Sequence, residues 1–204
     1  MAIEVWLTYT LAAGILLIIP GPTILLVVSY ALTEGRRSAV AIVAGVVLGD
    51  LTAMTVSIAG LGALLAASAT LFTVMKWVGA AYLVYLGVRM WRSSPVLEDA
   101  APEANGRSPW AMLGHSFAVT ALNPKGIVFF VAFLPQFVSA QRPVLPQLLI
   151  LGGTFLVLAF LNAAGYALMA GSVRTLLRRP RTLRNVQRAG GSLLVGAGVL
   201  TASL

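Results

Sequence analysis

Long apolar segments separated by short polar loops dominate the hydrophobicity pattern of this chain. Each of the first five exceeds the roughly 20 residues that a helix needs to cross a bilayer, and the sixth is close to that length. The pattern therefore predicts an all-α integral membrane protein with six transmembrane helices. The apolar segments cover residues 5–32, 38–66, 71–91, 110–138, 146–171 and 187–204.

One plainly aqueous stretch, residues 93–109, separates the third apolar segment from the fourth. Its serines, prolines and acidic residues are typical of a flexible linker. We therefore expect a single transmembrane domain over residues 1–204, built from two halves of three helices, about 1–92 and about 110–204.

Composition and charge support a membrane protein and predict its orientation. The chain is 59% hydrophobic and 10% charged, whereas soluble domains carry about 25% charged residues. The net charge of +8 does not require a nucleic-acid partner, because six spans would gather eleven basic residues on one side. That side is predicted to be cytoplasmic, which leaves both termini extracytoplasmic; the same cluster could also recruit anionic lipid. The eleven are Arg36, Arg37, Arg89, Arg92, Arg107, Arg174, Arg178, Arg179, Arg181, Arg184 and Arg188.

The first apolar segment is interrupted near its middle by Pro20-Gly21-Pro22. Two prolines remove two N–H donors and clash with the preceding turn, so a continuous helix is not expected. In hydrocarbon the freed backbone groups need partners from protein or from a water-filled cavity. The break is therefore a candidate binding site. An ordinary kink is the alternative, because proline and glycine are common in membrane helices.

The second half of the chain repeats features of the first. Asn123-Pro124-Lys125 in the fourth segment answers Gly21-Pro22-Thr23 in the first, and residues 79–88 align without gaps on residues 190–199. Three spans per half would make these halves inverted-topology repeats with broken first and fourth helices. In many transporters such paired breaks mark a substrate site at mid-membrane.

Charged and polar groups fall within the spans near these breaks. A carboxylate such as Asp50 costs about 2.5–3.5 kcal/mol there on insertion scales and marks function by default, with a structural ion pair or a protonated acid as the alternative. Lys125 either reaches toward the interface or pairs with Asp50. Asn162 falls nearly opposite Asp50 in the repeat and shares a helix face with Thr154 and Tyr166. That stripe either joins helices or lines a solvated path.

These groups suit an amino-acid substrate, which carries a carboxylate and an ammonium. The helix restarting at Pro22 would present its positive dipole end to the carboxylate. Asp50 could receive the ammonium or a proton, and a small amine or cation would use several of the same groups. The predicted substrate-binding or coupling residues are Pro20, Gly21, Pro22, Thr23, Asp50, Asn123, Pro124, Lys125 and Asn162.

The motifs together resemble the LysE/RhtB family of amino-acid exporters over nearly the whole chain. The resemblance implies a multi-pass protein of the bacterial inner membrane that exports amino acids of the homoserine/threonine or lysine/arginine type, driven by the membrane potential or by proton antiport. The residues that carry it are Pro20-Gly21-Pro22, Gly35-Arg36-Arg37, Gly45, Gly49-Asp50, Gly79 to Gly87, Asn123-Pro124-Lys125-Gly126 and Phe133-Leu134-Pro135-Gln136-Phe137.

Other functions and partners are less well supported by the sequence. The chain has no cysteine and one histidine, His115, so we expect no metal or cofactor and no enzymatic activity. A structural subunit would not need Asp50 or paired breaks. A passive channel, or an exporter of another small cationic or zwitterionic metabolite, remains an alternative. Gly45 and Gly49 form a GxxxG motif, which packs helices within a bundle or between two copies of the chain as a homodimer.

Six spans place the linker and the C-terminus on opposite sides of the membrane. Reporter fusions after Arg107 and at Leu204 should therefore report the cytoplasm and the extracytoplasmic side, respectively. Two cytoplasmic signals would contradict the sixth span and, with it, the inverted repeat.

Overall fold

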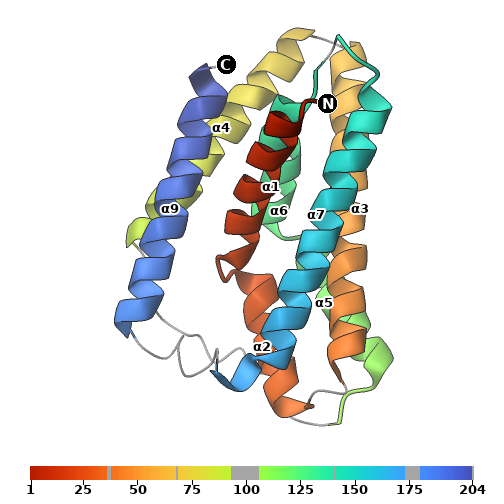
Figure 1. Ribbon diagram of the computed structural model, residues 1–204, viewed down its shortest axis with the longest axis vertical. Helices are drawn as coiled ribbons and strands as arrows, with labels where there is room; N and C mark the ends of the chain where they lie inside the picture. The colour runs from red at the N-terminus through yellow and green to blue at the C-terminus, as the bar shows by residue number, and fades with distance from the viewer. Residues whose placement is uncertain (36–37, 68, 93–105, 140, 173–179, 204) are drawn as a thin grey trace.

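A computed structural model describes residues 1–35, 38–67, 69–92, 106–139, 141–172 and 180–203. The described residues are mostly helical and include no strand, which confirms the all-α fold class. Most of the predicted linker, at 93–105, and the basic stretches at 36–37 and 173–179 lie outside the described residues. The described helices run side by side along one long axis (Figure 1).

The described helices form six rods, one for each predicted apolar segment. The first contains α1 (Ile3–Ile18) and α2 (Pro22–Thr33), and the next two are α3 (Ala39–Ala67) and α4 (Ala69–Arg92). The fourth contains α5 (Pro109–Ala121), α6 (Pro124–Val128), the π-helix η2 (Phe129–Phe133) and the 3₁₀ helix η3 (Leu134–Phe137). The last two are α7 (Val144–Leu168) and α9 (Pro180–Ser203). The beginning of α1 and the end of α9 lie toward the same end of the bundle (Figure 1).

Helix length and composition identify up to four membrane spans among the described residues. Residues 39–60 of α3 and all of α7 are long and apolar enough to cross a bilayer by themselves. The pair α1 and α2, and the rod from α5 to η3, pass the same test if each bent pair is one span. Six spans and their inverted repeat therefore stay a prediction.

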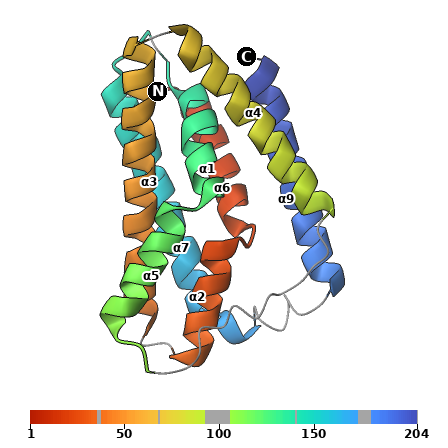
Figure 2. The same ribbon diagram turned by 180° about the vertical axis from the view of Figure 1, so that it is seen from behind.

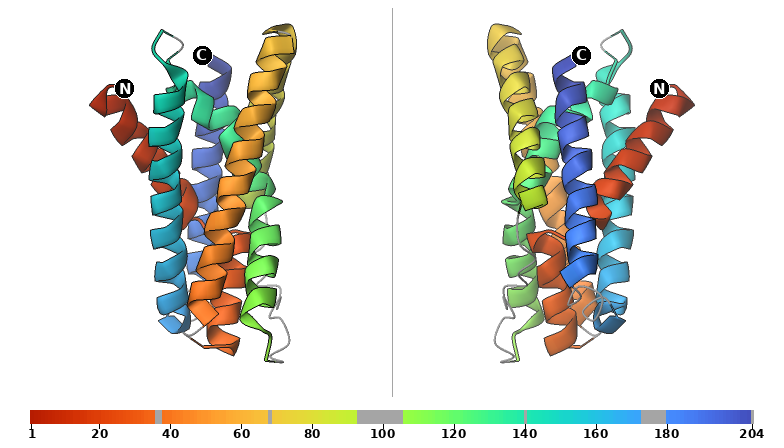
Figure 3. Two further views of the ribbon diagram at one scale, coloured as in Figure 1. Left: turned by 90° about the vertical axis from the view of Figure 1, so that its right-hand side faces the viewer. Right: turned by 90° about the vertical axis from the view of Figure 1, so that its left-hand side faces the viewer.

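Both predicted helix breaks are present, and both lie at mid-height in the bundle (Figures 1 and 2). The axis turns by 55° between α1 and α2 and by 45° between α5 and the segment that follows Pro124. A proline occupies the first position of α2 and of α6, where its missing N–H costs no helical hydrogen bond. As a result of the first bend, α1 leans away from the other helices (Figure 3).

The GxxxG motif of α3 packs against α5 within the chain. A Cβ atom added at Gly45 would clash with the Leu113 carbonyl oxygen and lie 2.9 Å from the Ser116 Cβ. One added at Gly49 would lie 2.7 Å from the Thr120 Cβ. Of the two arrangements that the motif allows, this is the intramolecular one.

The glycines that align between the two halves also pack closely. A Cβ atom at Gly79 would lie 2.7 Å from Ala132 of η2, in the broken rod of the other half. A Cβ atom at Gly190 would lie 2.7 Å from Ile19, beside the break in the first rod. Each glycine therefore lets a helix approach the broken rod of the opposite half.

Replacing Gly45 by alanine should destabilise the bundle, because the new methyl group meets backbone that cannot move away. We expect a loss of roughly 1–3 kcal/mol, as for overpacked cores, measured as a lower thermal unfolding midpoint in detergent. Gly60→Ala is the matched control on the same helix, since a Cβ there meets nothing within 4 Å. Equal midpoints for the two variants would contradict the packing described here.

Candidate functional site

The Pro20-Gly21-Pro22 break leaves four backbone carbonyl groups without helical partners at the end of α1. In a continuous helix, the carbonyl of residue i accepts a hydrogen bond from the N–H of residue i+4. The partners of Leu16 and Ile18 would be Pro20 and Pro22, which have no N–H. The chain turns away before the remaining two carbonyls, those of Leu17 and Ile19, can be paired.

Side chains from the second half of the chain bind all four carbonyls. The Lys125 Nζ donates to the Leu16 oxygen and the Ile19 oxygen, at 2.8 Å each. The Asn162 Nδ2 donates to the Leu17 oxygen at 3.1 Å, and the Tyr166 hydroxyl donates to the Ile18 oxygen at 2.7 Å. The first broken helix is therefore completed by α6 and α7.

Electrostatics favours this arrangement. The C-terminus of a helix carries a partial negative charge, so the ammonium of Lys125 complements the end of α1. A hydrogen bond to a charged group typically stabilises by about 1.5–3 kcal/mol, and a polar group left unpaired in an apolar environment costs several kcal/mol. Lys125 thus donates its hydrogen bonds to backbone carbonyls, whereas pairing with Asp50 is one of the two roles that the sequence leaves open for it.

The two breaks are also joined directly. The Asn123 Nδ2 donates to the Thr23 Oγ1 at 3.1 Å, and the Thr120 hydroxyl donates to the same oxygen at 3.4 Å. Asn123 also caps α6, because its Oδ1 accepts from the Lys125 backbone N–H at 3.1 Å. The start of α2 is therefore fixed against the end of α5 and the start of α6.

A small polar cavity of about 40 Å³ lies between the breaks. The predicted proline residues are not among its walls; they set the backbone that surrounds it. The other six predicted residues all line it: Gly21, Thr23, Asp50, Asn123, Lys125 and Asn162.

Asp50 reaches this cavity from α3, and only 7% of its surface is exposed. None of the residues that the structure describes forms a hydrogen bond with its carboxyl group. The carboxyl group and the Lys125 ammonium nevertheless line the same cavity and interact electrostatically. The cavity thus contains a buried acid that has electrostatic but no hydrogen-bonding partners among the described residues.

The polar stripe on α7 joins this helix to the first rod along its length. Besides the contacts of Asn162 and Tyr166, the Thr154 Oγ1 accepts from the Trp6 Nε1 at 3.0 Å. Of the two interpretations of the stripe, the structure therefore favours helix association. Tyr166 and Thr120 were not among the predicted site residues. Their spacing is the available signal, since each lies three or four residues from a predicted asparagine.

His115 does not line the polar cavity and instead contacts Tyr30 near the end of α2. Its Nδ1 lies 2.8 Å from the hydroxyl of Tyr30, which is fully buried, and the Arg107 guanidinium donates to that hydroxyl at 3.4 Å. The three residues connect the beginning of the fourth rod to the end of α2.

Comparison with known proteins gives matches over the whole chain. An uncharacterized membrane protein of Vibrio cholerae is 35% identical over 203 residues, which cover 100% of this chain and 98% of the relative. The homoserine/homoserine lactone efflux protein of Salmonella typhimurium is 34% identical with the same coverage. The leucine efflux protein of Klebsiella pneumoniae is 30% identical over 191 residues, or 93% of this chain and 88% of the relative. No solved structure matches.

The family comparison agrees with the resemblance in the motifs. The sequence pattern of the LysE type translocators matches residues 14–203, which include both breaks and every residue that lines the polar cavity. This chain therefore belongs to the LysE type translocator family.

Proposed function

We propose that the protein exports an amino acid from the cytoplasm across the bacterial inner membrane by proton antiport. The observation that carries this proposal is the polar cavity between the two helix breaks, which places an acid, a base and two amides inside an otherwise apolar bundle. Relatives named as homoserine/homoserine lactone and leucine efflux proteins support the substrate class.

The cavity offers complementary groups for both ends of an amino acid. Thr23 and Ile24, in the first turn of α2, line it, and their N–H groups precede the first backbone hydrogen bond that α2 closes, from Leu25 to Gly21. Such N–H groups and the positive helix end favour a carboxylate. Leu16 and Asp50, which also line the cavity, and the Ile19 carbonyl, which binds the Lys125 ammonium beside it, favour an ammonium.

Transport requires this cavity to open, because its volume of about 40 Å³ leaves room for water but not for an amino acid. Opening requires α1, α6 and α7 to separate, since these elements close the cavity through the hydrogen bonds at the first break. Because side chains close the centre of the bundle, we favour a carrier that alternates between closed and open states. A permanently open channel fits this arrangement less well.

Six spans in two inverted repeats are part of the proposal. The helices that correspond between halves make corresponding contacts: α3 packs on α5 of the second half, and α7 packs on α1 and α2 of the first. The third helices correspond in the same way: Gly79 of α4 packs against η2 of the second half, and Gly190 of α9 packs against Ile19 of the first. Such symmetry would let each half move against the other around the central cavity.

Replacing Pro20 by alanine should impair amino-acid efflux more than it impairs expression. Alanine supplies an N–H that can pair with the Leu16 carbonyl, so the helix can close and Lys125 loses one of its two partners. We expect at least a tenfold lower rate of efflux of labelled leucine or homoserine from loaded cells; Pro124→Ala tests the second break in the same way.

Pro109→Ala is the matched control, because Pro109 is exposed in the first turn of α5 and frees no helical carbonyl. Its efflux should equal that of the unsubstituted protein. Near-normal efflux by the Pro20→Ala, Pro124→Ala double variant would reduce both breaks to ordinary kinks.

Asp50 is the proposed coupling group. A carboxyl group that is dry in one state and solvated or paired in another binds and releases a proton during the cycle. Asp50→Asn preserves size and hydrogen bonding but cannot titrate. It should abolish efflux from proteoliposomes driven by an acid-outside pH gradient, while the variant still purifies as a folded monodisperse protein.

Two further variants isolate the titration at this position. Asp50→Glu keeps a carboxyl group and should retain part of the pH-driven rate. Glu4→Gln makes the same change at an exposed carboxylate in the first turn of α1 and should leave the rate unchanged. If Asp50→Asn still exports the amino acid against its concentration gradient at the original rate, proton coupling must depend on another residue.

A further inference from the structure

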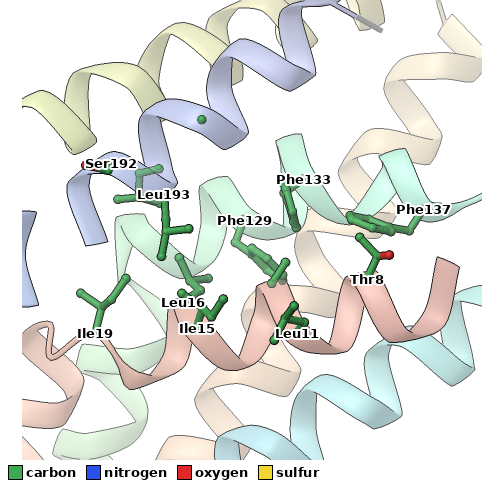
Figure 4. A pocket seen from close by; sticks show the side chains of 13 residues that line it. Thr8, Leu11, Ile15, Leu16, Ile19, Phe129, Phe133, Phe137, Ser192 and Leu193 are labelled. Carbon is green, nitrogen blue, oxygen red and sulfur yellow. The ribbon is translucent and has the colours of Figure 1, made fainter. Parts of the chain in front are cut away.

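A second cavity lies beside the polar one and has the opposite chemistry. It has a volume of about 340 Å³ between α1, the segment from η2 to η3, and α9, and it is open to the outside of the bundle beside the exposed side chains of Leu11 and Leu193. Apart from Thr8 and Ser192, the described residues that line it are apolar, and none of them is charged (Figure 4). Its lining includes Leu11, Ile15 and Leu16 of α1 and Phe129 and Phe133 of η2.

The two cavities share a wall at the first helix break. Leu16 lines both of them. Ile19 has its side chain in the apolar cavity, while its carbonyl binds the Lys125 ammonium on the polar side. One turn of α1 therefore separates the polar groups from the apolar space, and a movement of that turn would join them.

The sizes of the two cavities are complementary. The polar cavity is too small for a whole amino acid, whereas the apolar cavity falls within the roughly 300–1,000 Å³ that small-molecule sites occupy. A molecule with a compact charged head and an apolar side chain would divide naturally between them.

We propose that the apolar cavity receives the side chain of the exported amino acid while its ammonium and carboxylate occupy the polar cavity. This inference rests on the proposed export function and specifies its substrate class. The class is amino acids with uncharged, mostly apolar side chains of about the size of leucine. A lysine or arginine side chain is disfavoured, because none of the described residues that line the apolar cavity is an acidic partner for a cation.

Filling the apolar cavity from α9 provides the test. A Cβ atom added at Gly196 meets nothing within 4 Å, so the side chain of Gly196→Leu can enter the space without displacing backbone. In proteoliposomes containing the full-length protein, its apparent affinity for leucine should fall about tenfold or more, as expected when a leucine side chain loses its apolar site. Its affinity for alanine, which has only a methyl group, should change less than about twofold.

Matched variants separate this effect from a general one. Gly14→Leu adds the same side chain on α1 at another open position that does not line the cavity, and it should change neither affinity. Ala12→Leu fills the cavity from the opposite wall and should reproduce the selective loss, which keeps the test available if Gly196→Leu does not fold.

Other results would overturn the inference. An unchanged ratio of leucine to alanine affinity in both filling variants would show that the cavity does not bind the side chain. Phospholipid that copurifies with the unsubstituted protein and is lost from Gly196→Leu, with that ratio unchanged, would identify a lipid acyl chain as the occupant. Failure of the unsubstituted protein to transport leucine, alanine or homoserine would overturn the proposed function itself, and the side-chain site with it.

Discussion

The four carbonyl groups at the end of α1 impose the constraint on which the centre of this protein depends. Proline at positions 20 and 22 removes the N–H partners of two of them, and the turn of the chain leaves the other two unpaired. The surrounding bundle is too apolar to leave any of them without a partner. Lys125, Asn162 and Tyr166 supply the missing donors from elements more than 100 residues away in sequence. Folding of the first rod is thereby coupled to the placement of α6 and α7.

The two breaks differ in how they satisfy their backbone. At the second break the chain uses local turns, since the Asn123 N–H donates to the Thr120 carbonyl at 3.1 Å and the Asn123 side chain caps α6. The first break has no such local closure for the carbonyls of residues 16–19. Its four carbonyls therefore lose their hydrogen-bond donors if α6 and α7 move away from α1.

The sequence was sufficient to predict features that depend on local chemistry. Proline removes a donor wherever it occurs, so both breaks could be located, and a buried carboxylate such as Asp50 is costly enough to mark the cavity. The sixth apolar segment begins at Gln187, whereas α9 begins at Pro180. Arg181 and Arg184 made that region resemble a loop, although charged residues can extend a helix beyond the apolar part of a membrane.

Features that depend on tertiary contacts could not be predicted in the same way. The GxxxG motif allows packing within or between chains, and only the position of Leu113 and Ser116 beside Gly45 distinguishes the two. Similarly, a lysine and an aspartate inside one bundle suggest an ion pair. Lys125 instead binds the Leu16 and Ile19 oxygens. These are backbone atoms, which every residue has, so the residue types in the sequence do not indicate this contact.

The position of Lys125 has a consequence for the proposed cycle. Its ammonium donates hydrogen bonds to two carbonyl oxygens at the end of α1. The same oxygens could accept hydrogen bonds from the ammonium of an amino acid. A substrate that replaced it there would release Lys125 within the cavity that it shares with Asp50. Pairing of the released lysine with that carboxylate would stabilise the ionised acid, so substrate entry would favour proton release. Binding and proton movement would then be linked through a single side chain, without a second site.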